Sequence, residues 1–138
     1  MEQVTIFTRG IAKAEPGLAA IGVHLVDAEG KVLREVSEAI GNATTAYAEY
    51  FAVQRGLEVA KELFGNKTKQ VHFELKLESE LVKGQLAGER EVTDVGLVGY
   101  FIETHNLRVS HFPNLTFTQL CREDNKVVDR LVRNVLDA

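Results

Sequence analysis

The chain has 138 residues, of which 45% are hydrophobic and 26% are charged. These proportions are typical of a soluble globular protein, and the length fits one domain over residues 1–138. The formal net charge of −4 provides no overall positive field for nucleic acid, so any such contact must come from a local patch. The single cysteine, Cys121, excludes an internal disulfide, and we expect it to be a small buried residue at a strand end.

No apolar run in the sequence is long enough to cross a membrane. Residues 1–15 also lack the apolar stretch of a secretory signal. We therefore expect a cytoplasmic protein without a membrane partner.

The first half of the chain is predicted to form three strands and a long helix. Residues 4–7 favour a short strand, and residues 18–39 favour a hairpin around the turn-forming cluster at 27–30. Between residues 44 and 64 the apolar positions recur every three or four residues, which indicates a helix with one buried stripe. Gly65 is expected to end this helix as a C-cap.

The second half continues with strands and helices in alternation. Residues 71–78 alternate apolar and polar side chains, which predicts a half-buried strand, and Ser79 is expected to cap a short helix. A weaker helical pattern covers 92–105, and 115–120 indicate a last strand. A final helix is expected after Asp124 or Asn125, with these residues facing inward: Val127, Val128, Leu131 and Val135. This order suggests an α/β layer in which an antiparallel hairpin precedes strand–helix–strand crossovers.

Five short motifs follow one another along nearly the whole chain. They are Ile6-Phe7-Thr8-Arg9-Gly10, Pro16-Gly17-Leu18-Ala19-Ala20-Ile21-Gly22-Val23, Ala48-Glu49-Tyr50, Glu78-Ser79-Glu80-Leu81-Val82 and Arg122-Glu123-Asp124-Asn125. In this order and spacing the sequence resembles the ribonuclease H-like family, especially short prokaryotic ribonuclease H and the reverse-transcriptase-like domain. The resemblance implies an α/β fold with a five-stranded mixed sheet, three antiparallel strands followed by two parallel ones, and helices on both faces.

The resemblance also implies a chemistry. Ribonuclease H uses four carboxylates to hold two divalent cations, of which one activates water and the other stabilises the leaving oxygen. Three of these positions carry acids here, so the catalytic and metal-binding candidates are Glu49, Glu78 and Asp129, with magnesium as the expected cofactor. The fourth position, where the family has its first-strand Asp, is Arg9.

Arg9 is the departure that matters most. A guanidinium has five donors, no acceptor and a pKa above about 12, so it cannot bind magnesium. We predict instead that Arg9 forms salt bridges with the three acids and takes over the charge-balancing role of the metal. Glu78 keeps the charge of the Asp usual in the family, but its extra methylene moves the carboxylate by roughly 1–1.5 Å.

Two further residues are candidates for binding substrate. The family has Thr-Asn-Asn where this chain has Thr44-Thr45-Ala46, and those amides normally help to read the RNA strand through its 2′-hydroxyls. Thr45 offers one hydroxyl at this position. Arg122 stands where short members of the family often carry an arginine.

These observations predict a ribonuclease H-like domain with a degenerate two-metal site. We expect it to be inactive or weakly active, with RNA/DNA hybrid or another nucleic acid as a weak partner. One alternative is an active metal-dependent endonuclease that cleaves the RNA strand of hybrids, and another is a protein-interaction or homodimer module. The basic residues, for example Lys83, Arg108 and Arg133, are separated by acids along the chain, which favours a mixed solvated surface over a binding groove.

Overall fold

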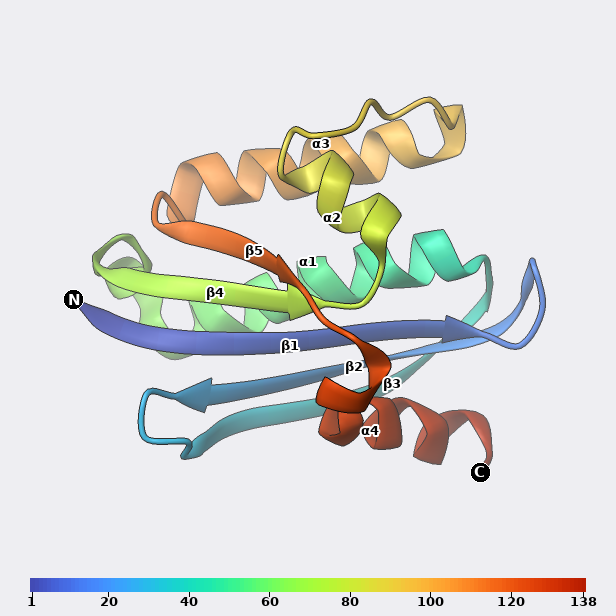
Figure 1. Ribbon diagram of the computed structural model, residues 1–138, viewed down its shortest axis with the longest axis horizontal. Helices are drawn as coiled ribbons and strands as arrows, with labels where there is room; N and C mark the ends of the chain where they lie inside the picture. The colour runs from blue at the N-terminus through green and yellow to red at the C-terminus, as the bar shows by residue number, and fades with distance from the viewer.

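The computed structural model describes residues 1–138, which form a five-stranded mixed sheet in the order β3-β2-β1-β4-β5 (Figure 1). The strands are β1 (Glu2–Ala12), β2 (Gly17–Asp27), β3 (Val32–Ala43), β4 (Val71–Leu77) and β5 (Leu115–Gln119). β1, β2 and β3 pair antiparallel, whereas β4 pairs parallel with β1 and β5 pairs parallel with β4. The predicted fold class is therefore confirmed.

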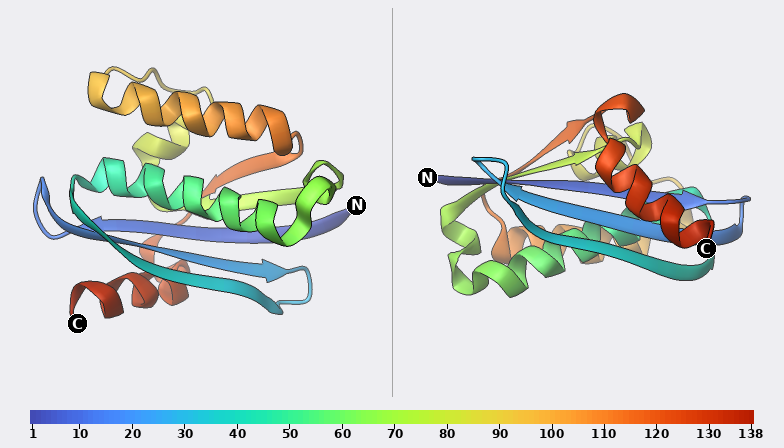
Figure 2. Two further views of the ribbon diagram at one scale, coloured as in Figure 1. Left: turned by 180° about the vertical axis from the view of Figure 1, so that it is seen from behind. Right: turned by 90° about the horizontal axis from the view of Figure 1, so that it is seen from below.

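Helices cover both faces of the sheet (Figure 2). They are α1 (Thr45–Phe64), α2 (Glu80–Leu86), α3 (Val95–His111) and α4 (Lys126–Leu136), with short 3-10 helices η1 (Gly65–Gln70) and η2 (Arg122–Asp124). α1 packs on β1 and β2 with α3 beside it, and α4 lies on the opposite face over β1, β2 and β3. None of the helices is long and apolar enough to cross a membrane.

The caps predicted at Ser79 and Gly65 are confirmed by their hydrogen bonds, and Thr44 supplies a further cap at the start of α1. The Thr44 side chain accepts a hydrogen bond from the backbone N–H of Tyr47, and Ser79 does the same for Val82. Gly65 adopts a φ of 55°, which favours glycine, and its N–H closes α1 on the carbonyl of Lys61. Side-chain and glycine capping therefore fix where α1 begins and ends and where α2 begins.

Some boundaries differ from the sequence prediction. β1 continues to Ala12 because its second half pairs with β2 well beyond the apolar segment at 4–7. α3 begins at Val95 and runs on to His111, and its periodicity is weak because apolar side chains such as Ile102 and Val109 face the solvent. Pairing with β2 therefore sets the length of β1, and the side chain of Asp94, which accepts a hydrogen bond from the Gly96 N–H, sets the start of α3.

The burial expected for several residues near the C-terminus was wrong in part. Cys121 is exposed, because β5 ends at Gln119 and the chain has already left the sheet when it reaches η2. In α4 the buried residues are Val128 and Val132, whereas the other predicted inward residues are only half-buried: Val127, Leu131 and Val135. The helix touches the sheet along a narrow stripe.

Gly22 explains how α4 approaches the sheet so closely. A Cβ atom at this position of β2 would lie 2.9 Å from the Val128 carbonyl oxygen and 2.9 Å from a Val132 methyl carbon. Any larger residue would push α4 outward. Gly22 therefore holds the last helix, and the side chains that it carries, against the strands.

Candidate functional site

The site lies where the carboxyl ends of β1 and β4 meet. These strands are parallel neighbours, so Arg9 near the end of β1 and Glu78 just after β4 fall at the same edge of the sheet. Glu49 reaches this edge from α1, and Asp129 reaches it from α4 on the other face. Four elements thus place one cation and three acids together.

Gly10 allows α1 to deliver Glu49. A Cβ atom on Gly10 would lie 2.3 Å from the carbonyl carbon of Ala48 and 2.5 Å from the backbone nitrogen of Glu49, so only glycine fits. The backbone N–H of Gly10 donates to Glu49 Oε1 at 3.3 Å. This close approach of strand and helix buries the Glu49 carboxylate.

Arg9 lies among all three acids, as predicted from the sequence. Its Nη1 donates to Glu49 Oε1 at 3.3 Å. Its Nε is 3.2 Å from Glu78 Oε2 and 3.6 Å from Asp129 Oδ1, contacts that are electrostatic because neither oxygen is aligned for a hydrogen bond. The guanidinium therefore offsets part of the mutual repulsion of the three acids.

Asn125 completes the site, and sequence reasoning gave it a different role. Its side-chain amide donates to Glu78 Oε2 at 2.8 Å and to the backbone carbonyl of Thr8 at 3.3 Å. It stands at the N-terminus of α4, as predicted, but its side chain does not cap the helix. Its place in the motif Arg122-Glu123-Asp124-Asn125 was the only sequence signal for it.

Burial makes Glu49 an unusual acid. Its side chain is 1% exposed, and its Oε2 has no hydrogen-bond partner. Loss of hydration raises the pKa of Glu49 to about 7, although the charge of Arg9 and the Gly10 N–H both act to lower it. Near neutral pH this carboxyl is therefore poised between its neutral and charged forms.

The stability of the protein is expected to fall as pH rises from about 4.5 to 7. In this range the folded protein keeps a proton on Glu49 that the unfolded chain has already released, so each rise in pH favours unfolding. A pKa raised from 4.5 to about 7 corresponds to a loss of about 3 kcal/mol. Urea denaturation at several pH values measures this change in the free energy of unfolding. Glu49→Gln cannot titrate, and the prediction is wrong if that variant shows the same fall.

The arrangement does not fit the divalent cations that the family resemblance implies. The positions that would face the metal include the Arg9 guanidinium, which has no lone pair to offer and carries a fixed positive charge. No group of three or more His, Cys, Asp or Glu side chains has a geometry that could hold a metal ion. The three acids converge instead on Arg9.

Neither substrate-binding candidate forms a hydrogen bond or ion pair with this cluster. The backbone N–H of Thr45 donates to Glu15 Oε2 at 3.0 Å, and its hydroxyl donates to the same carboxylate. This hydroxyl contact holds the pKa of Glu15 below its ordinary value. The Thr45 hydroxyl is therefore already engaged within the chain. Arg122 is exposed in η2, with no acid within salt-bridge distance.

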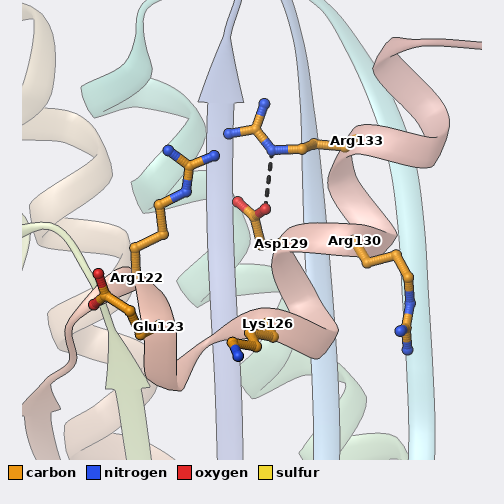
Figure 3. Close-up of a pocket in the computed structure, with 6 residues that line it drawn as sticks. All are labelled: Arg122, Glu123, Lys126, Asp129, Arg130 and Arg133. Atoms are coloured by element: carbon orange, nitrogen blue, oxygen red, sulfur yellow. Dashed lines mark hydrogen bonds and ion pairs between the residues drawn. The ribbon is translucent and has the colours of Figure 1, made fainter.

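Arg122 belongs to a basic groove that sequence reasoning missed. The groove has a volume of about 550 Å³ and is lined by Arg122, Glu123, Lys126, Asp129, Arg130 and Arg133 (Figure 3). Asp129 joins it to the site, because its Oδ2 accepts from Arg133 Nε at 2.9 Å while Oδ1 faces Arg9. The helical spacing of these cations was the available signal.

Comparison with known proteins agrees with this fold. A family model described as reverse transcriptase-like matches residues 7–135. Ribonuclease HI of Halobacterium salinarum is 32% identical over 135 residues, which cover 98% of this chain and 65% of the archaeal protein. This chain therefore spans somewhat less than two thirds of that relative.

Solved structures are similar over nearly the whole chain. LC11-RNase H1, isolated from compost by a metagenomic approach, has a TM-score of 0.93 and 36% identity, covering 99% of this chain and 97% of its own. The same ribonuclease in complex with an RNA/DNA hybrid has a TM-score of 0.92 and 36% identity, covering 97% and 96%. Sequence and structure together establish that the chain belongs to the reverse transcriptase-like, ribonuclease H-like family.

Proposed function

We propose that this domain is a degenerate ribonuclease H-like module that binds RNA/DNA hybrid and cleaves it weakly or not at all. The observation that carries the proposal is the position of the Arg9 guanidinium, within 3.2–3.6 Å of Glu49, Glu78 and Asp129. A fixed cation at the centre of the acids offsets part of their repulsion without a metal. It supplies no water activation, because a guanidinium neither binds water as a Lewis acid nor accepts its proton.

The three acids of the cluster do not act as a general base for water in place of a metal. Glu78 and Asp129 each lie against Arg9, and Asp129 also accepts a hydrogen bond from Arg133, so both carboxylates are held in ion pairs. Glu49 has a pKa raised to about 7, but it is fully buried and its Oε1 is occupied by Arg9 and Gly10. The site therefore offers no carboxylate that is both free of a cation and open to an attacking water.

Support for hybrid binding comes from the relatives and from local charge. The compost ribonuclease, which is 36% identical, has been solved with an RNA/DNA hybrid. In this chain a basic groove adjoins the site although the net charge is −4. Contacts to a phosphate backbone need such a local positive surface and do not need a catalytic metal.

The test is binding and turnover of one fluorescent hybrid in the same sample. We expect an increase in anisotropy on adding protein in EDTA, with an affinity that magnesium does not increase. The labelled RNA strand should remain intact on a denaturing gel. Magnesium-dependent cleavage would favour the alternative of an active endonuclease, and absence of binding to hybrid would contradict the proposal directly.

A further inference from the structure

The outer face of α4 carries a row of basic side chains. Lys126, Arg130 and Arg133 are spaced four and three residues apart, so they project from one side of the helix, and Arg122 joins them from η2 (Figure 3). They line the groove beside the site together with Asp129 and Glu123, and no hydrophobic residue contributes to it.

Most of this positive charge has no partner within the chain. Arg122, Lys126 and Arg130 are exposed and have no acidic oxygen within 4.0 Å, whereas Arg133 is held by Asp129. Like charges four residues apart, as in Lys126 and Arg130, destabilise a helix. The row therefore weakens α4 in the free protein, and an anion in the groove would relieve that repulsion.

We propose that this groove binds backbone phosphates of nucleic acid and holds the strand beside the Arg9 cluster. The inference rests on the proposed function and adds the surface that performs the binding. At a rise of 1.5 Å per residue, Lys126 and Arg133 lie about 10 Å apart along the helix, which matches about three nucleotide steps of one strand. Asp129 connects the groove to the cluster, so a strand lying in it runs past Arg9.

A nucleic acid that approaches this end of the sheet needs such a positive surface, because the neighbouring Arg9 cluster carries net negative charge. Three acids surround the single guanidinium of Arg9, so a phosphate that approached the cluster alone would meet net negative charge. The groove presents four cations and two acids at its edge. Its excess positive charge offsets the repulsion and steers a polyanion to this end of the sheet.

The experiment compares two triple variants that remove the same charge. The test variant is Arg122→Gln, Lys126→Gln, Arg130→Gln, which leaves the Arg133–Asp129 bond in place. The matched control is Lys61→Gln, Lys67→Gln, Lys69→Gln, three exposed lysines in the last turn of α1 and in η1 with no acid within 4.0 Å. Binding of a labelled RNA/DNA hybrid in EDTA is measured over a range of salt concentrations.

We expect the test variant to bind about a hundredfold more weakly near 0.1 M salt, with a salt slope smaller by two to three units. The control should bind like the wild type, and both variants should keep the wild-type circular dichroism because the altered side chains are exposed. The test variant should melt at or slightly above the wild-type temperature, because it loses the repulsion between Lys126 and Arg130. Arg130→Lys, which keeps the charge, should bind normally.

The outcomes separate this inference from the proposed function. Equal weakening of the two triple variants, or unchanged binding by the test variant, overturns the groove while hybrid binding by the wild type stands. If the wild type does not bind hybrid, both ideas fail. A test variant that binds weakly with an unchanged salt slope also counts against phosphate contacts, because losing such contacts must reduce the slope.

Discussion

Arg9→Asp is expected to make the stability of the protein depend on magnesium. In metal-free buffer the variant should lose roughly 3–5 kcal/mol, because the guanidinium that pairs with buried Glu49 is replaced by a fourth acid. The four acids then repel one another, which favours uptake of a divalent cation. Magnesium at about a hundred times its Kd should restore about 2.7 kcal/mol. Calorimetric melting with and without magnesium measures both effects.

Arg34→Asp is the matched control for this experiment. It makes the same change of charge in β3, where Arg34 forms only an exposed pair with Glu62 at 3.5 Å. Its cost should be about 1 kcal/mol or less, without any effect of magnesium. An Arg9→Asp variant whose melting temperature ignores magnesium would mean that Glu49, Glu78 and Asp129 do not form an ancestral metal site.

The wild-type protein is expected to cleave RNA/DNA hybrid at least about a thousandfold more slowly than an active ribonuclease of the family under the same conditions. This factor corresponds to roughly 4 kcal/mol of transition-state stabilisation, the scale expected when a bound metal no longer activates water and the leaving oxygen. Single-turnover cleavage of an end-labelled hybrid measures it. Glu49→Gln reveals contamination, because a trace nuclease would give the same residual rate in both preparations.

Successive substitutions should recover cleavage in steps. Arg9→Asp alone should restore part of the rate, since Glu78 still carries an extra methylene and residue 46 still lacks an amide. Adding Glu78→Asp, and then Thr45→Asn with Ala46→Asn, should raise it further. Strong magnesium-dependent cleavage by the wild type that disappears in Glu49→Gln would instead establish the active-endonuclease alternative.

The fold was predictable because local patterns and motif order agree. The helical period over 44–64, the alternation over 71–78 and the caps at Ser79 and Gly65 all appear in the structure. Strand lengths and the exposure of Cys121 were not predictable in the same way. They depend on which neighbour continues to pair with a strand and where the chain leaves the sheet, and neither property is local to the sequence.

The residues of the site were predictable from the sequence, whereas some of the contacts between them were not. The family motifs identified Arg9 and the three acids, and charge alone indicated that they would form ion pairs. The hydrogen bond from Asn125 to Glu78 was not predicted, because an asparagine before a helix is usually interpreted as its cap. The basic groove was missed because its cations are interleaved with acids along the chain and separate from them only when α4 and η2 are folded.

The manner in which α4 is attached has a consequence for local unfolding. It is the one α-helix on its face of the sheet, it buries only Val128 and Val132, and Asn125 ties its start to Thr8 and Glu78. Segments with so little buried surface open more readily than the core does, and amide hydrogen exchange detects such openings. When α4 detaches, Asp129 leaves the cluster together with the basic row. Arg9 on β1 and Glu49 on α1 keep their places. Docking of this last helix therefore controls both the charge of the site and its affinity for a polyanion.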